Sequence, residues 1–320
     1  LYNAAIDASL FKKRLNITFE AYISKTRDLL LSVQKASQSG FTSHFENIGR
    51  TSNKGVELTL GANIVRTKDF SLSANASLAY NKQEITKLSN SQYQAVGLQA
   101  GSLHNIRGLS GVYSQVIEEG YAAGEFYGYV CQGIDENGNY ILKQGEDGQP
   151  VKEHLGSAMP KWNLGLSINM AYKDFDLTLA GYGMFGHKIL NATKMELYDS
   201  TRLPAQNTLD DFLTSGVKQG AIFSDYFLES GNFFRMQTVT LGYNVPGVKK
   251  IGLSKVRFYL TAENLFTITS YSGMDPEVYI PDNVLSGPGI DRLIIDNGTS
   301  EGSTYSPRPR TFSLGVNVTF

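Results

Sequence analysis

The sequence predicts an all-β fold, a transmembrane antiparallel β-barrel with long loops on one side and short turns on the other. Three observations lead to it. Polar and apolar residues alternate with period two in segment after segment. These segments are longer than the ~5–6 residues of an ordinary strand and reach the ~9–11 residues that a tilted membrane-spanning strand needs. Their connections alternate between tight turns and long loops, as in outer-membrane barrels.

Composition supports strands and argues against several other classes of protein. Tyr (18), Phe (17) and Gly (32) are plentiful, which suits pleated surfaces and turns. Lys and Arg (29) nearly balance Asp and Glu (30), so no nucleic-acid partner is indicated. The single Cys131 cannot form an intrachain disulfide and is interpreted as an unpaired thiol. Apolar runs are far shorter than the ~20 residues of a membrane-spanning helix.

Nine strands are predicted along the chain, each with one apolar and one polar face. In the fourth strand Phe70, Leu72 and Ala74 alternate with Ser71 and Ser73, and the last strand has the same pattern. The predicted ranges are 1–11, 14–25, 55–66, 69–82, 161–173, 175–186, 232–245, 255–267 and 309–320.

The connections assign a side of the membrane to each end of the strands. Short links lie at Lys12-Lys13, Thr67-Lys68, Lys173-Asp174 and Pro246–Ser254. Long loops are predicted at 26–54, 83–160, 187–231 and 268–308. If Phe320 ends a strand on the periplasmic side, all four long loops lie outside the cell.

Aromatic residues on the apolar parity fall near both ends of the strands, where two aromatic girdles are expected. They are Phe70, Tyr172, Phe175 and Tyr243 near the short turns, and Tyr80, Trp162, Phe185 and Phe266 near the long loops.

The polar strand faces carry charged residues and are therefore expected to face a lumen. Glu20, Glu57, Asp176, Arg257 and Glu263 lie on them. Nine strands do not close a barrel, because bacterial single-chain barrels have even strand numbers and an open edge in lipid leaves backbone groups unpaired. We therefore expect further strands before Leu1 and interpret the chain as a fragment.

Several stretches, in this order and spacing, resemble the C-terminal barrel of SusC/RagA-like TonB-dependent transporters. They are NIGRTSNKGVELTLG at 47–61, YAAGEFYGYVCQGIDENGNYIL at 121–142, HLGSAMPKWNLGLSINMAYKDFDLTLAGYGMFGHKILN at 154–191, FFRMQTVTLGYNVP at 233–246 and VRFYLTAENLFTITSYSGMDPEV at 256–278. The resemblance spans nearly all of the chain and is weakest in the loops at 84–111, 192–230 and 279–305.

The resemblance implies that residues 1–320 are the last strands of a barrel of about 22 strands, closed around a plug. The plug and the TonB-binding segment would lie upstream. It further implies an outer-membrane location in a Gram-negative bacterium of Bacteroidota type and a SusD-like surface lipoprotein as a lid. TonB-coupled import of oligosaccharides or oligopeptides is expected, by a dimer of transporter–lipoprotein pairs. No enzymatic activity and no cofactor are implied.

Three alternatives remain at this stage. A passive porin would share the strand pattern without a plug or partner. A TonB-dependent receptor for siderophores or vitamins would import other cargo. A barrel enzyme is disfavoured, because no histidine stands at metal-ligand spacing from Asp, Glu or Cys. The four histidines, His44, His104, His154 and His187, fall in or beside the predicted loops.

Two aromatic stretches of the long loops are candidates for contacts with substrate or with the lid protein, since aromatic faces stack on sugars and apolar side chains. Their residues are Tyr121, Phe126, Tyr127, Tyr129, Phe223, Tyr226 and Phe227. The alternative is that these side chains pack against neighbouring loops.

A second candidate follows the strand 255–267 and matches the loop motif of the family. It comprises Tyr271, Gly273, Asp275, Pro276 and Glu277, with Asp282 and Asp291 beyond. The acidic residues could bind a cation or a substrate hydroxyl. The favoured interpretation is a turn in which Pro276 fixes φ and Asp275 accepts local hydrogen bonds.

Residues 135–139, DENGN, have alternating oxygen ligands as in a calcium loop. The sixth position of such a loop needs Gly, and Tyr140 stands there. A hairpin with a type I′ turn at Asn137-Gly138 is favoured over a calcium site, and Asp147-Gly148 is expected to form a second turn. No metal ligands are assigned.

We predict that Phe320→Ala impairs barrel assembly, because a terminal aromatic residue guides insertion in barrels that the family resembles. The amount of protein in the outer membrane measures this effect, and unchanged levels would contradict it.

Overall fold

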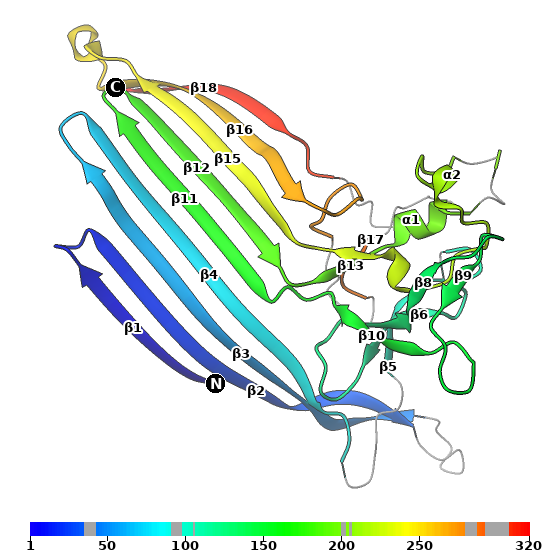
Figure 1. Cartoon of the computed structure of the whole chain (residues 1–320). Helices are drawn as coiled ribbons and strands as arrows, with labels where there is room; N and C mark the ends of the chain where they lie inside the picture. Colours follow the sequence, from blue (N-terminus) through cyan, green and yellow to red (C-terminus); the bar gives the residue numbers. More distant parts are fainter. Residues whose placement is uncertain are drawn as a thin grey trace.

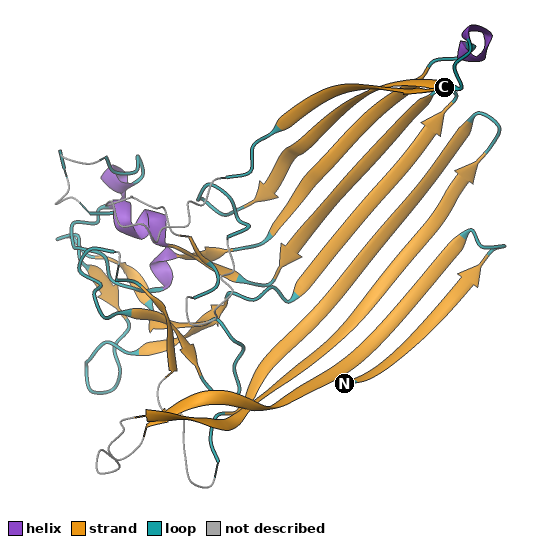
Figure 2. Ribbon diagram, turned by 180° about the vertical axis from the view of Figure 1, so that it is seen from behind, coloured by secondary structure: helices purple, strands orange, loops and turns teal. Residues whose placement is uncertain are grey.

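A computed structural model of the chain describes residues 1–34, 43–90, 98–104, 106–199, 203–204, 207–278, 287–291 and 307–320. They form one large curved antiparallel sheet and a smaller domain at one end of its strands (Figure 1). Both chain termini belong to strands at the margins of the sheet, as the view from behind in Figure 2 shows.

The large sheet has nine strands in the order of the sequence, β1-β2-β3-β4-β11-β12-β15-β16-β18. All nine predicted strands are present, and each pairs antiparallel with its neighbours. Within the described residues β1 and β18 each have one partner, so the sheet is a barrel wall with two open edges. Its strands are β1 (Tyr2–Leu10), β2 (Leu15–Gln34), β3 (Ser43–Arg66), β4 (Phe70–Lys87), β11 (Trp162–Tyr172), β12 (Phe175–Phe185), β15 (Phe233–Asn244), β16 (Lys255–Thr269) and β18 (Thr311–Thr319).

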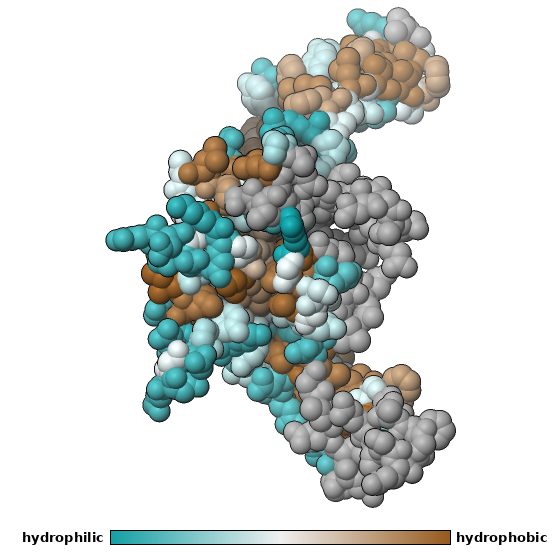
Figure 3. Space-filling view, turned by 90° about the vertical axis from the view of Figure 1, so that its right-hand side faces the viewer, coloured by the Kyte–Doolittle hydropathy of each residue, from teal (hydrophilic) through white to brown (hydrophobic). Residues whose placement is uncertain are grey.

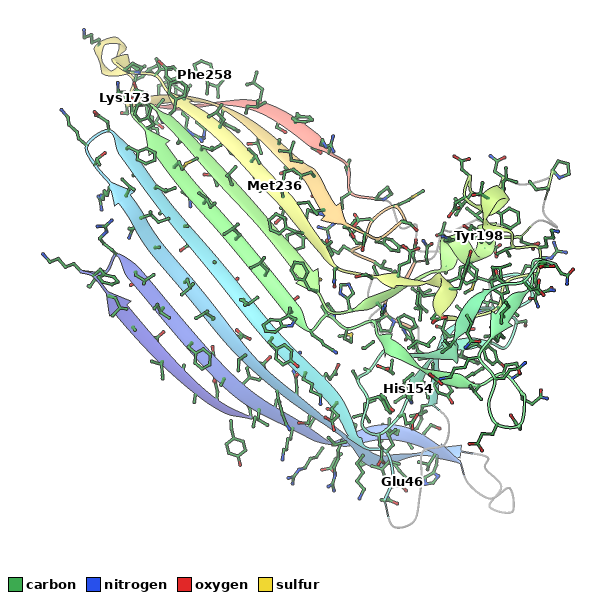
Figure 4. All side chains as sticks on the ribbon, viewed as in Figure 1. Glu46, His154, Lys173, Tyr198, Met236 and Phe258 are labelled. Atoms are coloured by element: carbon green, nitrogen blue, oxygen red, sulfur yellow. The ribbon has the colours of Figure 1, made fainter. Side chains whose placement is uncertain are left out.

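Tight turns join the strands at the end marked by Lys173 and Phe258 in Figure 4. Phe11, Lys12 and Lys13 have positive φ, and so does Lys173. The β15–β16 link contains a short 3-10 helix, η4 (Val248–Ile251). These are the predicted short connections.

One face of the large sheet is apolar and exposed to its surroundings. Leu314, Leu260 and Tyr172 are 81%, 48% and 54% exposed. A soluble protein would not leave so wide an apolar surface in water, so this face is the one that meets lipid.

Aromatic side chains form two rows across the lipid-facing surface. The strand register places Tyr172 opposite both Phe70 and Phe175, and Tyr243 opposite both Phe175 and Phe258. At the other end Trp162 lies opposite Tyr80, with ring centroids 4.7 Å apart, and opposite Phe185. The rows are the two aromatic girdles expected at the membrane interfaces.

The opposite face carries polar cross-strand contacts. The Arg257 guanidinium pairs with the Asp176 carboxylate at 2.5 Å, and Thr240 and Thr261 share a hydrogen bond of 3.0 Å. Tyr22 lies across Gly55 of the next strand, where a Cβ would collide with its ring. This face is the lumenal one.

The prediction of a long loop at 26–54 is wrong for most of its length. β2 continues to Gln34 and β3 begins at Ser43, so the two strands form an arm beyond the barrel wall. Bulges between Thr26 and Leu29 and between Leu29 and Leu30, with Asp28 at φ 60°, interrupt the alternation there. The alternation pattern therefore predicted an end of β2 that is too early and a start of β3 that is too late. β4 likewise extends to Lys87.

The loop domain comprises the described residues of 98–158, 187–231 and 287–291. Its elements are β5 (Leu98–Ser102), β6 (Tyr113–Ile117), β7 (Glu125–Tyr129), β8 (Cys131–Ile134), β9 (Tyr140–Leu142), β10 (Lys152–Ser157), β13 (Lys188–Asn191), α1 (Ala192–Leu197), α2 (Phe212–Ser215), η3 (Asp225–Phe227), β14 (Leu228–Ser230) and β17 (Ile290–Asp291). They form sheets β10-β7-β6-β5, β14-β13-β17 and β8-β9. None of the helices in the described ranges has the length and hydropathy to cross a membrane.

A compact apolar core holds the loop domain together, drawn from segments far apart in sequence. Its most buried members are Leu103, Phe126, Leu190, Met195, Tyr198, Phe223 and Phe227. Burial of such side chains stabilises the domain by about 1.5–3 kcal/mol each.

The ends of β2–β4 pack against this domain through a second apolar cluster. Val33, Ile48, Ile85 and Leu88 are buried there. The backbone of Ile85 also exchanges hydrogen bonds of 2.8 Å with Gly120 and Tyr121. The loop domain is thus fixed against the barrel wall.

The segment 287–291 lies inside the loop domain and ties the last long loop to it. Gln115 Nε2 donates to the Pro288 carbonyl at 2.6 Å, and Leu190 N donates to the Gly289 carbonyl at 2.9 Å. Gly289 has φ 68°, and a Cβ there would stand 2.5 Å from the Ala158 Cβ. Glycine is required for both reasons.

We predict that Gly289→Ala releases residues 287–291 from the loop domain. The left-handed φ costs about 1–2 kcal/mol and the collision about 1–3 kcal/mol more. Hydrogen exchange of Leu190 in the intact protein measures it. The control is Gly111→Ala, where φ is 77° and a Cβ has nothing within 4 Å. Equal exchange in the two variants would contradict the packing argument.

Candidate functional site

Arg235 is the centre of a polar cluster at the loop-domain end of the lumenal face. It lies on β15 opposite Tyr182 of β12 and Thr267 of β16, so the three side chains share one face of the sheet. The guanidinium is 2% exposed and donates from Nε to Thr267 Oγ1 at 3.1 Å. The Phe233 ring lies 5.5 Å from it.

A bulge is what directs Arg235 into the lumen. The register of β12 on β15 passes from Ala180–Thr238 to Gly181–Met236, leaving Gln237 as an extra residue. Strict alternation from Val239 would have put Arg235 on the lipid face, so sequence reasoning missed it. An arginine within a run of apolar strand residues was the available signal.

Two carboxylates of the last long loop neutralise Arg235. Its NH2 pairs with Asp275 Oδ1, and its NH1 lies 3.1 Å from Glu277 Oε2. Arg308 NH2 lies 2.8 Å from Glu277 Oε1, and Tyr182 OH also contacts Glu277. Charged groups removed from water need such pairing, so the network fixes this loop against the barrel wall.

The predicted family motif lies in this network. The Asp275 Oδ1 atom accepts from the Glu277 N–H at 2.9 Å, which closes a turn around Pro276. Tyr271 OH donates to Asp291 Oδ2 at 2.6 Å, and its ring lies across Gly273, where a Cβ would collide. These contacts hold the loop in shape, and Asp282 is outside the described residues. A role for the motif in binding cargo stays a prediction.

A polar cavity of about 290 Å³ opens beside the cluster. Its lining combines guanidinium, carboxylate, hydroxyl and apolar groups from β15, β16, the loop around Pro276 and the segment before β18. They include Arg235, Asn264, Thr267, Asp275, Arg308 and Arg310.

The seven aromatic candidates divide into two groups. Phe126, Phe223 and Phe227 are at most 3% exposed and belong to the core of the loop domain, so their packing role is the one observed. Tyr226 packs edge-on against Phe227 with 5.0 Å between centroids. The three remaining tyrosines, Tyr121, Tyr127 and Tyr129, are half-buried at the surface.

Tyr121 and Tyr127 contact His154, and Tyr129 lies opposite Lys152 on the same β10–β7 pair. The His154 and Tyr121 rings stack with centroids 3.5 Å apart and planes within 4°. Tyr127 lies 5.1 Å away across the pair, and the Lys152 Nζ atom lies 5.2 Å from the Tyr129 ring. In Figure 4 His154 lies on the side of the loop domain toward the ends of β2–β4, whereas Tyr198 lies by the helices.

Two carboxylates flank His154. Its Nε2 is 3.4 Å from Glu118 Oε2, and its Nδ1 is 3.8 Å from Glu125 Oε1. Burial raises the pKa of the Glu125 carboxyl, and the neighbouring His154 opposes that rise. Spacing in sequence did not reveal this grouping, because positions 118, 125 and 154 come from separate segments. The surface offers aromatic faces, cations and hydrogen-bonding carboxylates together, and Figure 3 shows mixed hydropathy over this end of the molecule.

The other candidate motifs have structural explanations. The hairpin at 131–142 is confirmed, but its turn is not type I′, because neither Glu136 nor Asn137 has positive φ and only Gly138 does. The Asp135 carboxylate accepts from the N–H groups of Asn137 and Asn139. Burial raises the pKa of the Cys131 thiol. Within the ranges the structure describes, no three His, Cys, Asp or Glu residues are grouped to hold a metal.

Comparison with known proteins places the chain in a family. Residues 2–265 match the sequence model described as "TonB dependent receptor-like, beta-barrel". The chain belongs to this family. The matched residues include seven of the nine barrel strands in full, most of β16 and most of the loop domain.

Curated relatives and solved structures agree with this placement. The chain is 29% identical to TonB-dependent receptor SusC of Bacteroides thetaiotaomicron over 100% of its length, and 30% identical to TonB-dependent receptor P26 of Formosa agariphila over 99%. These matches cover 31% and 34% of those proteins, so the chain spans about a third of their length. The RagAB peptide transporter structure aligns with a TM-score of 0.74 at 25% identity, over 99% of this chain and 35% of that one.

Two predictions are confirmed by these findings. The chain is SusC/RagA-like, as the motifs at 47–61, 233–246 and 256–278 indicated. The family is one of outer-membrane β-barrel receptors and transporters, which agrees with the lipid-facing surface of the sheet.

We predict that Arg235→Gln frees the loop around Asp275 and Glu277, because it leaves two carboxylates without their buried cation. The local cost is about 3–5 kcal/mol. The double variant Arg235→Gln/Asp275→Asn should recover part of it, since one uncompensated charge is gone. Hydrogen exchange at Tyr271 to Glu277 measures both. Arg310→Gln, at the same cavity, is the control, and an equal effect there would contradict the buried-pair argument.

We predict that the segment around His187, which connects β12 to β13, is less stable in acid. Burial lowers the pKa of its imidazole to about 4, below its ordinary 6.5. The unfolded segment therefore binds a proton between these values while the folded one does not, and stability is lost as pH falls from about 6.5 toward 4, by about 3 kcal/mol at most.

The Gly231 amide donates to the His187 carbonyl at 3.0 Å. Its protection factor, the exchange rate relative to that of an unstructured amide at the same pH, reports this opening when it is compared at pH 7 and pH 5. His187→Gln should reduce the pH dependence, whereas substitution of the exposed His104 by Gln should leave it unchanged. A pH dependence that survives in His187→Gln would assign it to other groups.

Proposed function

We propose that this chain is the C-terminal barrel part of a TonB-energised importer of nutrient oligomers, oligosaccharides or oligopeptides. The observation that carries the proposal is the match over 99% of the chain, loop domain included, to a structure described as a RagAB peptide transporter. A relative named SusC covers the same residues.

The surface around His154 supports polar oligomers as cargo. Half-exposed Tyr121 and Tyr127 offer ring faces, and Glu118 offers a carboxylate that is 51% exposed. Aromatic faces stack on sugar rings and on apolar side chains, while carboxylates bind sugar hydroxyls or the cationic groups of peptides.

The remaining parts of the importer are inferred from the family. We infer a barrel of about 22 strands in which residues 1–320 supply the last nine, with a plug and a TonB-contacting segment in the preceding sequence. A SusD-like surface lipoprotein acts as the lid, and two transporter–lipoprotein pairs form a dimer. The loop domain, at the long-loop end of the strands, faces that lid.

Uptake by intact cells tests the proposal. Cells expressing the whole transporter with its lipoprotein take up fluorescent oligosaccharides and oligopeptides, with and without a protonophore. We expect protonophore-sensitive uptake of one of the two classes. Uptake that resists the protonophore would support a passive porin, and uptake only of an iron–siderophore complex or a vitamin would support the other receptor class.

Substitution of two tyrosines locates the cargo surface. Tyr121→Ala with Tyr127→Ala should raise the half-saturating concentration by about 2–10-fold, the equivalent of losing one or two ring contacts. Tyr172→Ala, on the lipid face, should leave uptake unchanged. Equal effects of the two changes would contradict a role of the surface around His154 in binding cargo.

Native mass spectrometry of the protein purified gently from outer membranes tests the partners. A lipoprotein in equal amount and a parent much heavier than 35.2 kDa are expected. A lone species near that mass would contradict both the partner and the missing strands.

A further inference from the structure

Lysine follows the lipid-facing apolar run on three neighbouring strands. Toward the loop domain, the outward-facing apolar residues end with Ile23 on β2, Val56 on β3 and Tyr80 on β4. The next outward position on each strand is Lys25, Lys54 and Lys82, and all three are exposed. β2 to β4 run as blue to cyan ribbons in Figure 1.

The direction of these side chains follows from the other face. Ile85, which shares the face opposite to Lys82, is 4% exposed against the loop domain. Tyr22 and Gly55, whose neighbours in sequence are Ile23 and Lys54, meet on the lumenal face. The lysines therefore point away from the lumen. They lie on the outer surface of the sheet, which faces lipid farther from the loop domain.

Their height matches the edge of the membrane. Lys82 is the next outward residue beyond Tyr80, whose ring meets Trp162 in the aromatic girdle of this end. Side chains one step beyond a girdle lie among lipid headgroups. This level belongs to the outer leaflet, since the long loops lie on the same side.

The register leaves like charges directly opposed. Lys54 pairs across the ladder with Lys82, and Arg50 pairs with Lys87 further along the same two strands. Like charges directly opposite each other destabilise a sheet. The Lys82 Nζ atom lies 3.4 Å from Glu84 Oε2, which offsets part of the repulsion, although the lysine side chain is still 60% exposed.

We propose that Lys25, Lys54 and Lys82, with Arg50 and Lys87, bind the phosphate of an anionic lipid headgroup in the outer leaflet. A phosphate accepts charge-assisted hydrogen bonds from several ammonium groups at once and removes their mutual repulsion. The acyl chains of such a lipid continue onto the apolar surface below the lysines. The site contains no part of the His154 surface, so it is separate from the proposed cargo path.

Lipid retention by the intact transporter tests the proposal. The protein in detergent is mixed with diphosphorylated lipid A or with the same lipid stripped of phosphate, and native mass spectrometry counts the bound lipids. We expect retention of the phosphorylated lipid. The triple variant K25Q/K54Q/K82Q should lose it, by about fivefold in affinity for each lysine removed.

Matched variants separate the site from net charge and from folding. K12Q/K13Q/K68Q removes three exposed lysines from the short turns at the other end of the strands and should retain the lipid. K25R/K54R/K82R should retain it as well. Equal loss in the two glutamine variants, or equal retention of the lipid without phosphate, would overturn the proposal. Heat-modifiable gel mobility checks that each barrel is folded.

Inorganic phosphate in place of lipid distinguishes the source of the anion. It is expected to leave the mass of the wild-type protein unchanged. Stable binding of inorganic phosphate without retention of any lipid would overturn the assignment to a headgroup.

Discussion

Continuous backbone pairing across the large sheet is the constraint on which the rest of the structure depends. In hydrocarbon each N–H and C=O must find a partner within the protein, and nine strands in sequence order achieve this for every strand but the two at the edges. Once the ladder is fixed, the pleat assigns each side chain to lipid or to the lumen. A slip of one residue would exchange the two faces and place Asp176 and Arg257 in lipid.

Departures from that ladder occur near the loop domain, where the protein needs another arrangement. The extra residue Gln237 rotates the end of β15 so that Arg235 and Phe233 turn inward, where they meet the last long loop. The bulges around Leu29 carry β2 and β3 out of the wall toward the core of the loop domain. Local irregularity therefore converts a uniform sheet into a wall with a fixed attachment for its loops.

The sequence was sufficient for the parts of the fold that repeat. Alternation such as that of Phe70 to Tyr80 depends only on neighbours in the chain, so the strands, girdles and short turns could be predicted. The arm formed by residues 26–34 and 43–51 could not, because bulges break the period that identifies a strand. The grouping of Glu118 and Glu125 with His154 depends on pairings between distant segments. The buried role of Phe126 and Phe227 likewise depends on tertiary packing, which aromatic content alone does not specify.

The parallel pair of β13 and β17 sets an order of events during biogenesis. It joins Leu190 to Ile290, and the chain between them contains both β15 and β16. Closing so long a connection is entropically unfavourable until the intervening strands have paired. We therefore expect the loop domain to be completed only after β16 has joined the sheet, so that a fully folded loop domain reports a sheet that is paired as far as β16.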